Sequence, residues 1–159
     1  MSSDVVVRRA SSSDLETCAA MAAKLVALHH GWDEKRYMML GDVACGYARF
    51  FASELHDAEA VIAIAEKDGI QVGYTYARFE GRDWNALLDE AGKIHDIYVE
   101  ENARGAGIAK SLLDYAEAEL GILGAKRVVL QVATQNQAGQ ATFAKTGYRT
   151  TLIEMCKEL

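Results

Sequence analysis

The strongest chemical signal in the sequence is a glycine-bearing turn, RGAGIAK, at residues 104–110. An apolar run, IHDIYV (residues 94–99), precedes the turn, and a run with apolar residues at helical spacing follows it. A helix N-terminus offers unpaired N–H groups and a positive dipole end, glycines allow close backbone approach, and an arginine adds a bidentate contact. A strand, a glycine turn and a helix in this order therefore predict a phosphate-binding site.

Two common nucleotide-binding motifs fit this turn poorly. A P-loop needs G-x-x-x-x-G-K-[ST], and although Lys110 and Ser111 are present, Arg104 and Ala109 occupy the glycine positions. A dinucleotide fingerprint needs G-x-G-x-x-G, but its third glycine position holds Lys110, whose long side chain would obstruct helix packing. A nucleotide-phosphate hydrolase therefore rests on Lys110 and Ser111 alone, and a tight connection without a ligand is the remaining simple alternative.

A third pattern fits better and recurs along the chain. Residues 104–109 match [Q/R]-x-x-G-x-[G/A], and Asn136 followed by FAKTGY (residues 143–148) matches N…[Y/F]-x-K-x-G-[F/Y]. With the opening VVVRRASSSDLE (residues 5–16), these segments resemble, in order, the GNAT superfamily of acetyl-CoA-dependent N-acetyltransferases. A tight connection would not explain the downstream tail, so the resemblance favours an acyltransferase of the EC 2.3.1 type.

The resemblance implies which residues bind acetyl-CoA, the co-substrate, and it implies no metal. In the family, the central strand pairs with the pantetheine arm, the loop N–H groups hold the pyrophosphate, and an asparagine on the next strand contacts the arm. The residues at those positions are Ile97, Tyr98, Val99, Arg104, Gly105, Ala106, Gly107, Ile108, Ala109, Lys110, Asn136 and Phe143.

The implied reaction is a direct attack of the amine on the thioester, and it needs two proton movements: one off the ammonium and one onto the departing thiolate. His95 and Asp96 precede the pantetheine-pairing residues, so they are the candidate catalytic pair. A histidine can take up a proton near neutral pH, although His95 could equally face a polar surface without a catalytic role. In a regular strand the two side chains would point to opposite faces, so both reach one site only if the strand is irregular.

Phe143 departs from the family pattern. Many relatives have a tyrosine there, whose hydroxyl protonates the thiolate, and phenylalanine cannot donate a proton. Either water or another residue supplies the proton, or the thiolate leaves unassisted. Phe143 therefore motivates a second hypothesis, a non-catalytic acyl-CoA-binding sensor module.

The elements that must position these residues form one mixed α/β domain over residues 1–159. The GNAT resemblance adds a central, mostly antiparallel sheet that is splayed at the cofactor cleft and flanked by helices. The expected strands are residues 5–10, 61–66, 71–79, 94–99 and 127–133, with one or two more in 148–159. The expected helices are residues 15–29, 42–55, 108–120 and 136–145, the first with a capping box of Ser13 and Glu16.

Composition narrows the class of partner. The chain has 159 residues with a formal net charge of −6, and its basic residues are scattered, so neither a nucleic-acid surface nor a membrane-binding face is expected. The opening residues lack the apolar core of a signal peptide, no apolar run approaches a bilayer span, and the three cysteines match no disulfide or zinc pattern. These features predict a cytoplasmic protein.

The acceptor is expected to be a small, cationic primary amine. Residues 29–37 and 79–84 mix aromatic rings with carboxylates, which suits a cation, although Trp32 and Trp84 could each simply pack in the core or an interface. A metal site at His29, His30, Asp33 and Glu34 fits no standard spacing. The resemblance also implies a homodimer.

Overall fold

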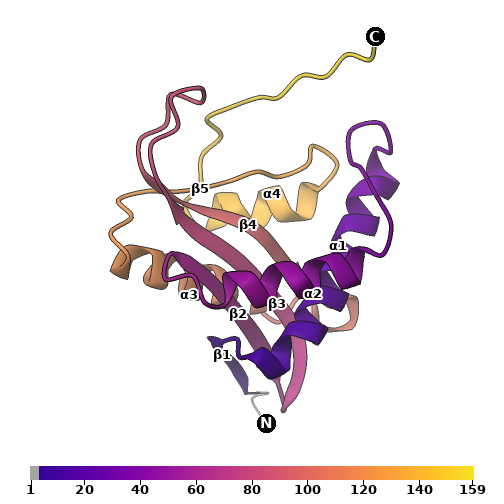
Figure 1. Ribbon diagram of the computed structural model, residues 1–159, viewed down its shortest axis with the longest axis vertical. Helices are drawn as coiled ribbons and strands as arrows, with labels where there is room; N and C mark the ends of the chain where they lie inside the picture. The colour runs from indigo at the N-terminus through magenta and orange to yellow at the C-terminus, as the bar shows by residue number, and fades with distance from the viewer. Residues whose placement is uncertain (1–3) are drawn as a thin grey trace.

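The computed structural model describes residues 4–159, so the first three residues of the domain expected over 1–159 lie outside the described part. Its centre is a five-stranded sheet in the order β1-β2-β3-β4-β5 (Figure 1). The strands are β1 (Val5–Arg9), β2 (Ala60–Lys67), β3 (Ile70–Glu80), β4 (Ala91–Val99) and β5 (Val128–Leu130). The helices are α1 (Leu15–Trp32), α2 (Val43–Glu54), α3 (Ile108–Ile122) and α4 (Gln137–Lys145).

The sheet is mixed, as predicted. Strands β1 to β4 pair antiparallel in sequence order, and β5 alone runs parallel to its neighbour, β4. The expected α/β class with a mostly antiparallel sheet is therefore confirmed. No helix within residues 4–159 combines the length and apolar character needed to cross a membrane.

Helices cover both faces of the sheet. Helices α1 and α2 lie on one face and α3 on the other (Figure 1). In β2, Ile62 and Ile64 pack with Phe51 of α2, whereas Val61 packs with Leu113 of α3. Because β2 is buried on both faces, its sequence is a continuous apolar run rather than an alternating one.

The start of α1 is held by a buried carboxylate. Asp14 accepts hydrogen bonds from both terminal nitrogens of Arg8, at 2.7 and 2.9 Å, and from the Ser11 N–H at 2.7 Å. The Arg8 guanidinium holds the pKa of Asp14 well below its usual range, against the opposing effect of burial. The capping box is therefore Ser11 with Asp14, and the predicted pair of Ser13 and Glu16 is wrong by two positions.

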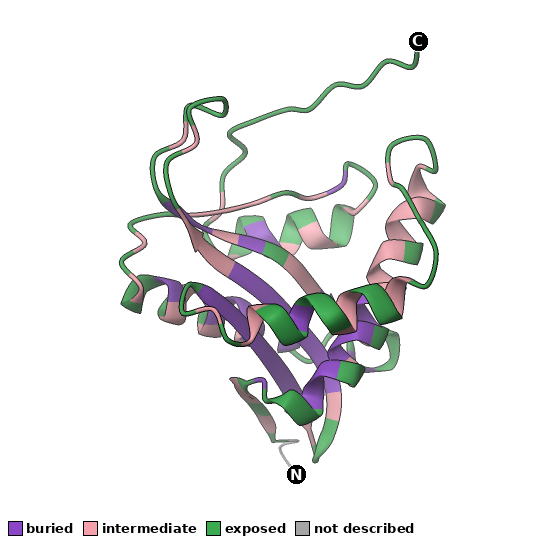
Figure 2. Ribbon diagram, in the orientation of Figure 1, coloured by how far each residue is buried: buried purple, intermediate pink, exposed green. Residues whose placement is uncertain are grey.

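Three further boundaries differ from the prediction. Helix α1 continues past His29 to Trp32 because Gly31 keeps a helical conformation there. Strand β5 has three residues rather than seven, and the backbone at Ala133 accepts a hydrogen bond from the Gln140 side chain at 3.0 Å instead of a strand partner. The strands predicted in residues 148–159 are absent: this tail is extended, pairs with no strand and is almost entirely exposed (Figure 2).

Candidate active site

The glycine turn forms an open loop at the N-terminus of α3. Gly105 and Gly107 have φ of 82° and 76°, a left-handed conformation that glycine adopts without steric cost. Residues 104–107 are exposed, whereas Ile108 is buried and fixes the first turn of α3 in the core. The loop therefore presents exposed backbone next to a helix N-terminus, which is the arrangement that binds an anion.

The two cations of the loop have protein partners. Arg104 donates from Nε to the Val99 carbonyl at 3.1 Å, and its guanidinium lies 5.8 Å from the centre of the Tyr98 ring. Lys110 pairs with Asp114 one turn along α3 at 2.6 Å. Backbone N–H groups, rather than these side chains, are therefore the main groups that the loop leaves for an anion.

Strand β4 has a free edge next to this loop. It pairs with β5 only from Gly92 to Ile94, so its edge beyond Ile94 has no strand partner in the described chain. Ile97 is half-buried, and Tyr98 and Val99 are buried. The residues expected to pair with the pantetheine arm thus lie on the part of β4 that β5 leaves uncovered.

Asn136 and Phe143 belong to α4. Asn136 lies at the start of the helix predicted over residues 136–145 rather than on the strand that the family resemblance implies; its side chain caps α4 by accepting from the Gly139 N–H at 2.9 Å. Phe143 is buried in the cluster that includes Ile94, with its ring centre 6.0 Å from that of Tyr148. Phe143 thus lines the interior beside β4, and it offers no proton.

An irregularity in β4 places His95 and Asp96 together. Opposite β3, Asp96 pairs with Tyr76 and Ile94 pairs with Ala77, so His95 is an extra residue with no partner. Such a bulge bends the strand and re-aims side chains. As a result, both His95 and Asp96 line a hollow of about 570 Å³ on the α2 side of the sheet.

His95 is held by two groups in this hollow. Its Nε2 lies 2.5 Å from Glu80 Oε1, and its ring stacks on that of Tyr76 at 5.5 Å between centres. Although burial opposes the shift, hydrogen bonds from Lys93 and His95 lower the pKa of Glu80. If the Nε2 proton is the one that Glu80 accepts, Nδ1 remains as a proton acceptor.

Asp96 lies deeper than His95. Its Oδ2 accepts a hydrogen bond from the Tyr74 hydroxyl at 3.0 Å. Burial raises the pKa of Asp96, only partly offset by this hydrogen bond and by the nearby histidines. The pair therefore combines a partly exposed histidine with a carboxyl that favours its neutral form more than an exposed aspartate does.

Helix α2 and strand β3 complete the hollow. Arg78 pairs with Glu54 and, at 3.0 Å, with Asp57, and Glu54 also accepts from the Tyr76 hydroxyl at 2.6 Å. Tyr47 of α2 lies in the same lining, and burial raises its pKa to about 12. The lining residues are Tyr47, Phe50, Glu54, Asp57, Tyr76, Arg78, Glu80, His95 and Asp96.

Sequence reasoning missed most of this lining. Of the segments expected to bind the acceptor, residues 79–84 contribute Glu80, but Trp84 is 75% exposed and lies beside Arg82. Residues 29–37 contribute nothing to the hollow: the ring nitrogens of His29 and His30 contact backbone carbonyls within α1 and the turn after it. The sequence does contain the aromatic residues of α2, but it does not show that they lie on the face of the helix that packs against β3.

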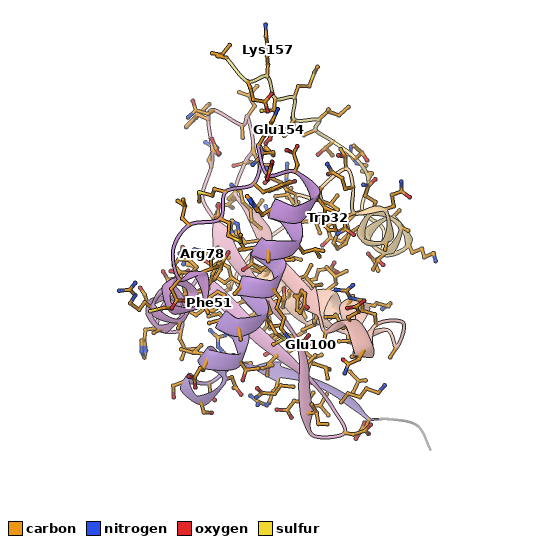
Figure 3. The ribbon with its side chains drawn as sticks, turned by 90° about the vertical axis from the view of Figure 1, so that its right-hand side faces the viewer. Trp32, Phe51, Arg78, Glu100, Glu154 and Lys157 are labelled. Carbon is orange, nitrogen blue, oxygen red and sulfur yellow. The ribbon has the colours of Figure 1, made fainter. Side chains whose placement is uncertain are left out.

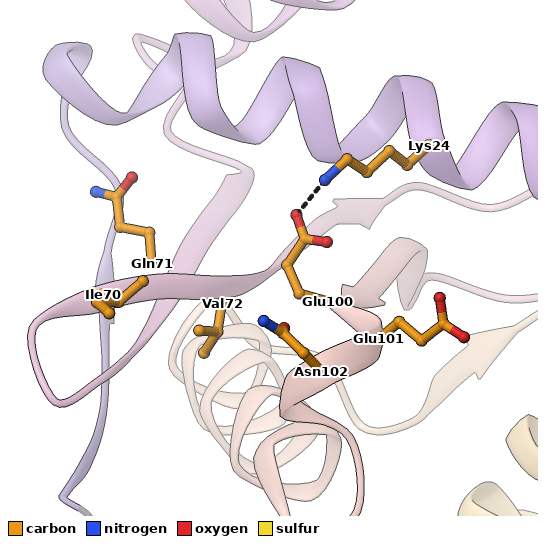
Figure 4. Close-up of a pocket in the computed structure, with 7 residues that line it drawn as sticks. All are labelled: Lys24, Ile70, Gln71, Val72, Glu100, Glu101 and Asn102. Carbon is orange, nitrogen blue, oxygen red and sulfur yellow. Dashed lines mark hydrogen bonds and ion pairs between the residues drawn. The ribbon is translucent and has the colours of Figure 1, made fainter.

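A second hollow, of about 510 Å³, lies near the far end of β4, beside α1 and the start of β3 (Figure 4). Lys24 of α1 pairs there with Glu100 at 2.7 Å, and Glu101 and Asn102 complete this side (Figure 4). With two carboxylates against one lysine, this hollow suits an anion less than the loop does.

Sequence comparisons point to one family. Residues 26–148 match the model of the acetyltransferase (GNAT) family. The chain is 28% identical to the uncharacterized N-acetyltransferase YhfO of Bacillus subtilis over 154 aligned residues. This alignment covers 94% of this chain and 95% of that protein. It is also 33% identical over 99 residues to an uncharacterized N-acetyltransferase of Mycobacterium tuberculosis, covering 62% of this chain and 59% of the relative.

Solved structures share the same fold. The aminoglycoside N-acetyltransferase AAC(6')-Iy in complex with CoA superposes with a TM-score of 0.80 at 18% identity, covering 100% of this chain and 97% of that one. A predicted acetyltransferase from Clostridium acetobutylicum, solved with acetyl-CoA, gives 0.74 at 20% identity, with 96% of each chain covered. At such low identity the likeness concerns the arrangement of strands and helices.

Proposed function

The chain belongs to the acetyltransferase (GNAT) family, and we propose that it transfers the acetyl group of acetyl-CoA to a primary amine of a small cationic molecule. The observation that carries this proposal is the bulge in β4, which brings His95 and Asp96 into one hollow where β4 stops pairing with β5. The glycine loop at residues 104–110 follows the end of β4 after a short turn at residues 101–103, so β4 connects the two halves of the proposed site.

Acetyl-CoA is the proposed acetyl donor. The exposed glycine loop suits its pyrophosphate, and the free edge of β4 suits the amides of its pantetheine arm. The Val99 carbonyl, which accepts a hydrogen bond from Arg104, lies where the free edge of β4 leads toward the glycine loop. Two of the fold relatives were solved with CoA or acetyl-CoA, which supports the same ligand here.

His95 is the proposed general base. Its free ring nitrogen takes the proton from the acceptor ammonium, and the Glu80 carboxylate stabilises the charged imidazole. The amine lone pair then attacks the thioester carbonyl carbon, and the C–S bond breaks with its electron pair on the CoA sulfur. The new amide nitrogen releases its surplus proton to water. Asp96, beside the histidine, orients the amine through a hydrogen bond from its nitrogen.

The departing thiolate has no tyrosine at the usual position. Phe143 lacks a hydroxyl, and Tyr148, which contacts it, donates its own hydroxyl to Glu117 at 2.8 Å. Water is therefore the proposed proton source. A thiolate is a better leaving group than an alkoxide, because a free thiol has a pKa of about 8.5, so the reaction tolerates this loss.

The charge of the hollow favours a cationic acceptor. Even if Asp96 is neutral, three carboxylates remain against two cations: Arg78 pairs with Glu54 and Asp57, and Lys93 pairs with Glu80 at 2.8 Å. The aromatic rings of α2 and β3 add faces that attract cations. Polyamines and aminoglycosides, which carry several ammonium groups, fit this lining, and an aminoglycoside is what the AAC(6')-Iy enzyme is named for.

The free cysteines fit a cytoplasmic setting.

Calorimetry followed by a turnover assay tests the proposal. We expect one-site binding of acetyl-CoA and none of Mg-ATP, then CoA release that rises with a polyamine or aminoglycoside in a panel of amines. Absence of acetyl-CoA binding would overturn the proposal altogether. Tight binding without turnover across the panel would instead favour the sensor, the second candidate, which Phe143 motivates.

A further inference from the structure

The extra residue of the β4 bulge has more than one place that it could occupy. In the structure it is His95, so that Asp96 pairs with Tyr76 and Ile97 pairs with Thr75 on β3. If Ile97 were the extra residue instead, Asp96 would pair with Thr75. Alternate side chains of a strand point to opposite faces, so Asp96 would then turn from α2 toward α3. The position of the bulge therefore decides whether Asp96 lies in the acceptor hollow.

The contacts of His95 do not settle this position. With the extra residue at Ile97, His95 would pair with Tyr76 and would still face α2. It would remain beside the Tyr76 ring and the Glu80 carboxylate that it contacts in the structure. The groups that fix the bulge must therefore be sought among the contacts of Asp96.

Thr75 contacts the backbone of Asp96 from the α3 side of the sheet. Its side chain is fully buried, and its hydroxyl donates to the Asp96 carbonyl oxygen at 2.8 Å. A half-turn of Asp96 about the strand axis would point this carbonyl away from β3, because the carbonyl direction reverses together with the side-chain face. The buried Thr75 hydroxyl would then lose its acceptor, which costs free energy.

Tyr74 contacts the side chain of the same residue from the α2 side. Its hydroxyl donates to Asp96 Oδ2 at 3.0 Å. The Tyr74 ring is fully buried, with its centre 5.9 Å from that of Phe51, the α2 residue labelled in Figure 3. Tyr74 pairs with Tyr98, so it reaches Asp96 diagonally across the ladder. Burial raises the pKa of Tyr74, so the hydroxyl keeps its proton and can serve only a carboxyl that faces α2.

We propose that Thr75 and Tyr74 are positioning residues, which fix the bulge at His95 and thereby keep Asp96 in the acceptor hollow. Neither residue lines the hollow, so both act through Asp96 and not on the substrate. Two consecutive residues of β3 point to opposite faces of the sheet, and each forms a bond that only the observed register of β4 allows. The effect on catalysis rests on the proposed function, but the position of the bulge can be measured without turnover.

Nuclear magnetic resonance of the full chain tests the position of the bulge. In the wild type, cross-strand nuclear Overhauser contacts should pair Asp96 with Tyr76. In Thr75→Val, which removes the hydroxyl and keeps the size, and in Tyr74→Phe, these contacts should weaken while contacts between Asp96 and position 75 appear. Thr75→Ser retains a hydroxyl and should keep the wild-type contacts. A Tyr74→Phe, Thr75→Val double variant that keeps the wild-type contacts would overturn the proposal.

The matched control is Thr142→Val in α4. This change removes another threonine hydroxyl that donates to a backbone carbonyl, that of Ala138 at 3.0 Å, away from the bulge. The contacts between β3 and β4, and kcat, should both stay at their wild-type values.

Turnover then links the bulge to the proposed reaction. At saturating acetyl-CoA, we expect Thr75→Val to lower kcat about 10- to 100-fold, because a displacement of about 1 Å in a reacting group can cost that much. The affinity for acetyl-CoA should not change, and Thr75→Ser should restore kcat. An equal loss of kcat in Thr75→Ser would overturn the positioning role. Shifted contacts with a wild-type kcat would instead refute the proposed role of Asp96, while the two residues would still be shown to fix the bulge.

Discussion

The glycine loop and the proposed acceptor hollow are built in opposite ways. The loop comprises consecutive residues, 104–110, and offers its backbone, whose shape is set by two left-handed glycines. The hollow collects side chains from α2, β3 and β4, from Tyr47 to Asp96, and offers their charge and hydrogen-bonding groups. A backbone site needs only local conformation, whereas a side-chain site needs the sheet register and the helix face to be correct. The two regions should therefore fail separately when mutated.

The largest effect confined to one of the two regions is expected for His95→Gln, which should lower activity without weakening acetyl-CoA binding. Loss of the proposed base should lower kcat by about 10²- to 10⁴-fold, since general-base catalysis typically contributes that much. Acetyl-CoA affinity, measured by calorimetry, should not change because the loop is untouched. The control is His56→Gln, an exposed histidine beyond α2, which should keep full activity. An equal loss of cofactor affinity in His95→Gln would show that the two regions are not independent.

The double variant Gly105→Ala, Gly107→Ala should show the reverse: weaker acetyl-CoA binding without a loss of kcat. A left-handed conformation costs a non-glycine residue about 1–2 kcal/mol, so acetyl-CoA should bind about tenfold or more weakly. At saturating acetyl-CoA, kcat should remain near the wild-type value because the hollow is intact. Gly121→Ala, in a helical and uncrowded position of α3, is the matched control and should bind normally. Unchanged affinity in the double variant would remove the loop from the site.

Asp96→Asn should separate stability from activity within the hollow. Because burial raises the pKa of Asp96 above its ordinary 3.8, the ionised form destabilises the folded protein. As the pH rises from about 3.8 through the raised pKa, the free energy of unfolding of the wild type therefore falls relative to that of the asparagine variant. Above the raised pKa, the difference in unfolding free energy between the two proteins stays constant. We expect the variant to be about 0.5–2 kcal/mol more stable at neutral pH and less active. Urea unfolding at pH 3.5 and pH 7 measures the difference, and a variant less stable at both would contradict it.

The smallest effect is expected for Glu54→Gln, which removes a negative charge from the acceptor side. We expect the KM for a polyamine to rise about threefold, because a partly exposed ion pair is worth up to about 1 kcal/mol. The KM for acetyl-CoA should stay the same, and added salt should reduce the difference between variant and wild type. Glu34→Gln, on an exposed turn outside the hollow, is the control. A rise in both KM values would mean that Glu54 supports the fold rather than the acceptor.

The same contrast explains what the sequence could predict. The class of fold, four helices and the first four strands followed from periodicity and turn residues, and the loop followed from a motif of adjacent residues. The hollow did not, because its lining depends on α2 packing its aromatic face against β3. Glu54 and Arg78 are 24 positions apart in sequence, so no local sequence pattern predicts the ion pair between them.

The ends of the chain's elements were the least predictable part. The last segment has the composition of a strand, so a strand was a sound expectation from Thr150, Thr151 and Ile153. Strand propensity does not supply a neighbour, and within the described chain the segment has none. Sequence patterns thus predict what a segment can form, while pairing depends on an edge that is within reach.

The bulge at His95 makes the length of β4 a determinant of its chemistry. Removal of one residue there would restore a regular ladder with β3, which by itself would suit the sheet better. The shorter strand would, however, turn either the imidazole or the carboxyl toward the apolar side of α3. A one-residue deletion that keeps both His95 and Asp96 would therefore leave the glycine loop intact but turn one member of the proposed catalytic pair toward the wrong layer.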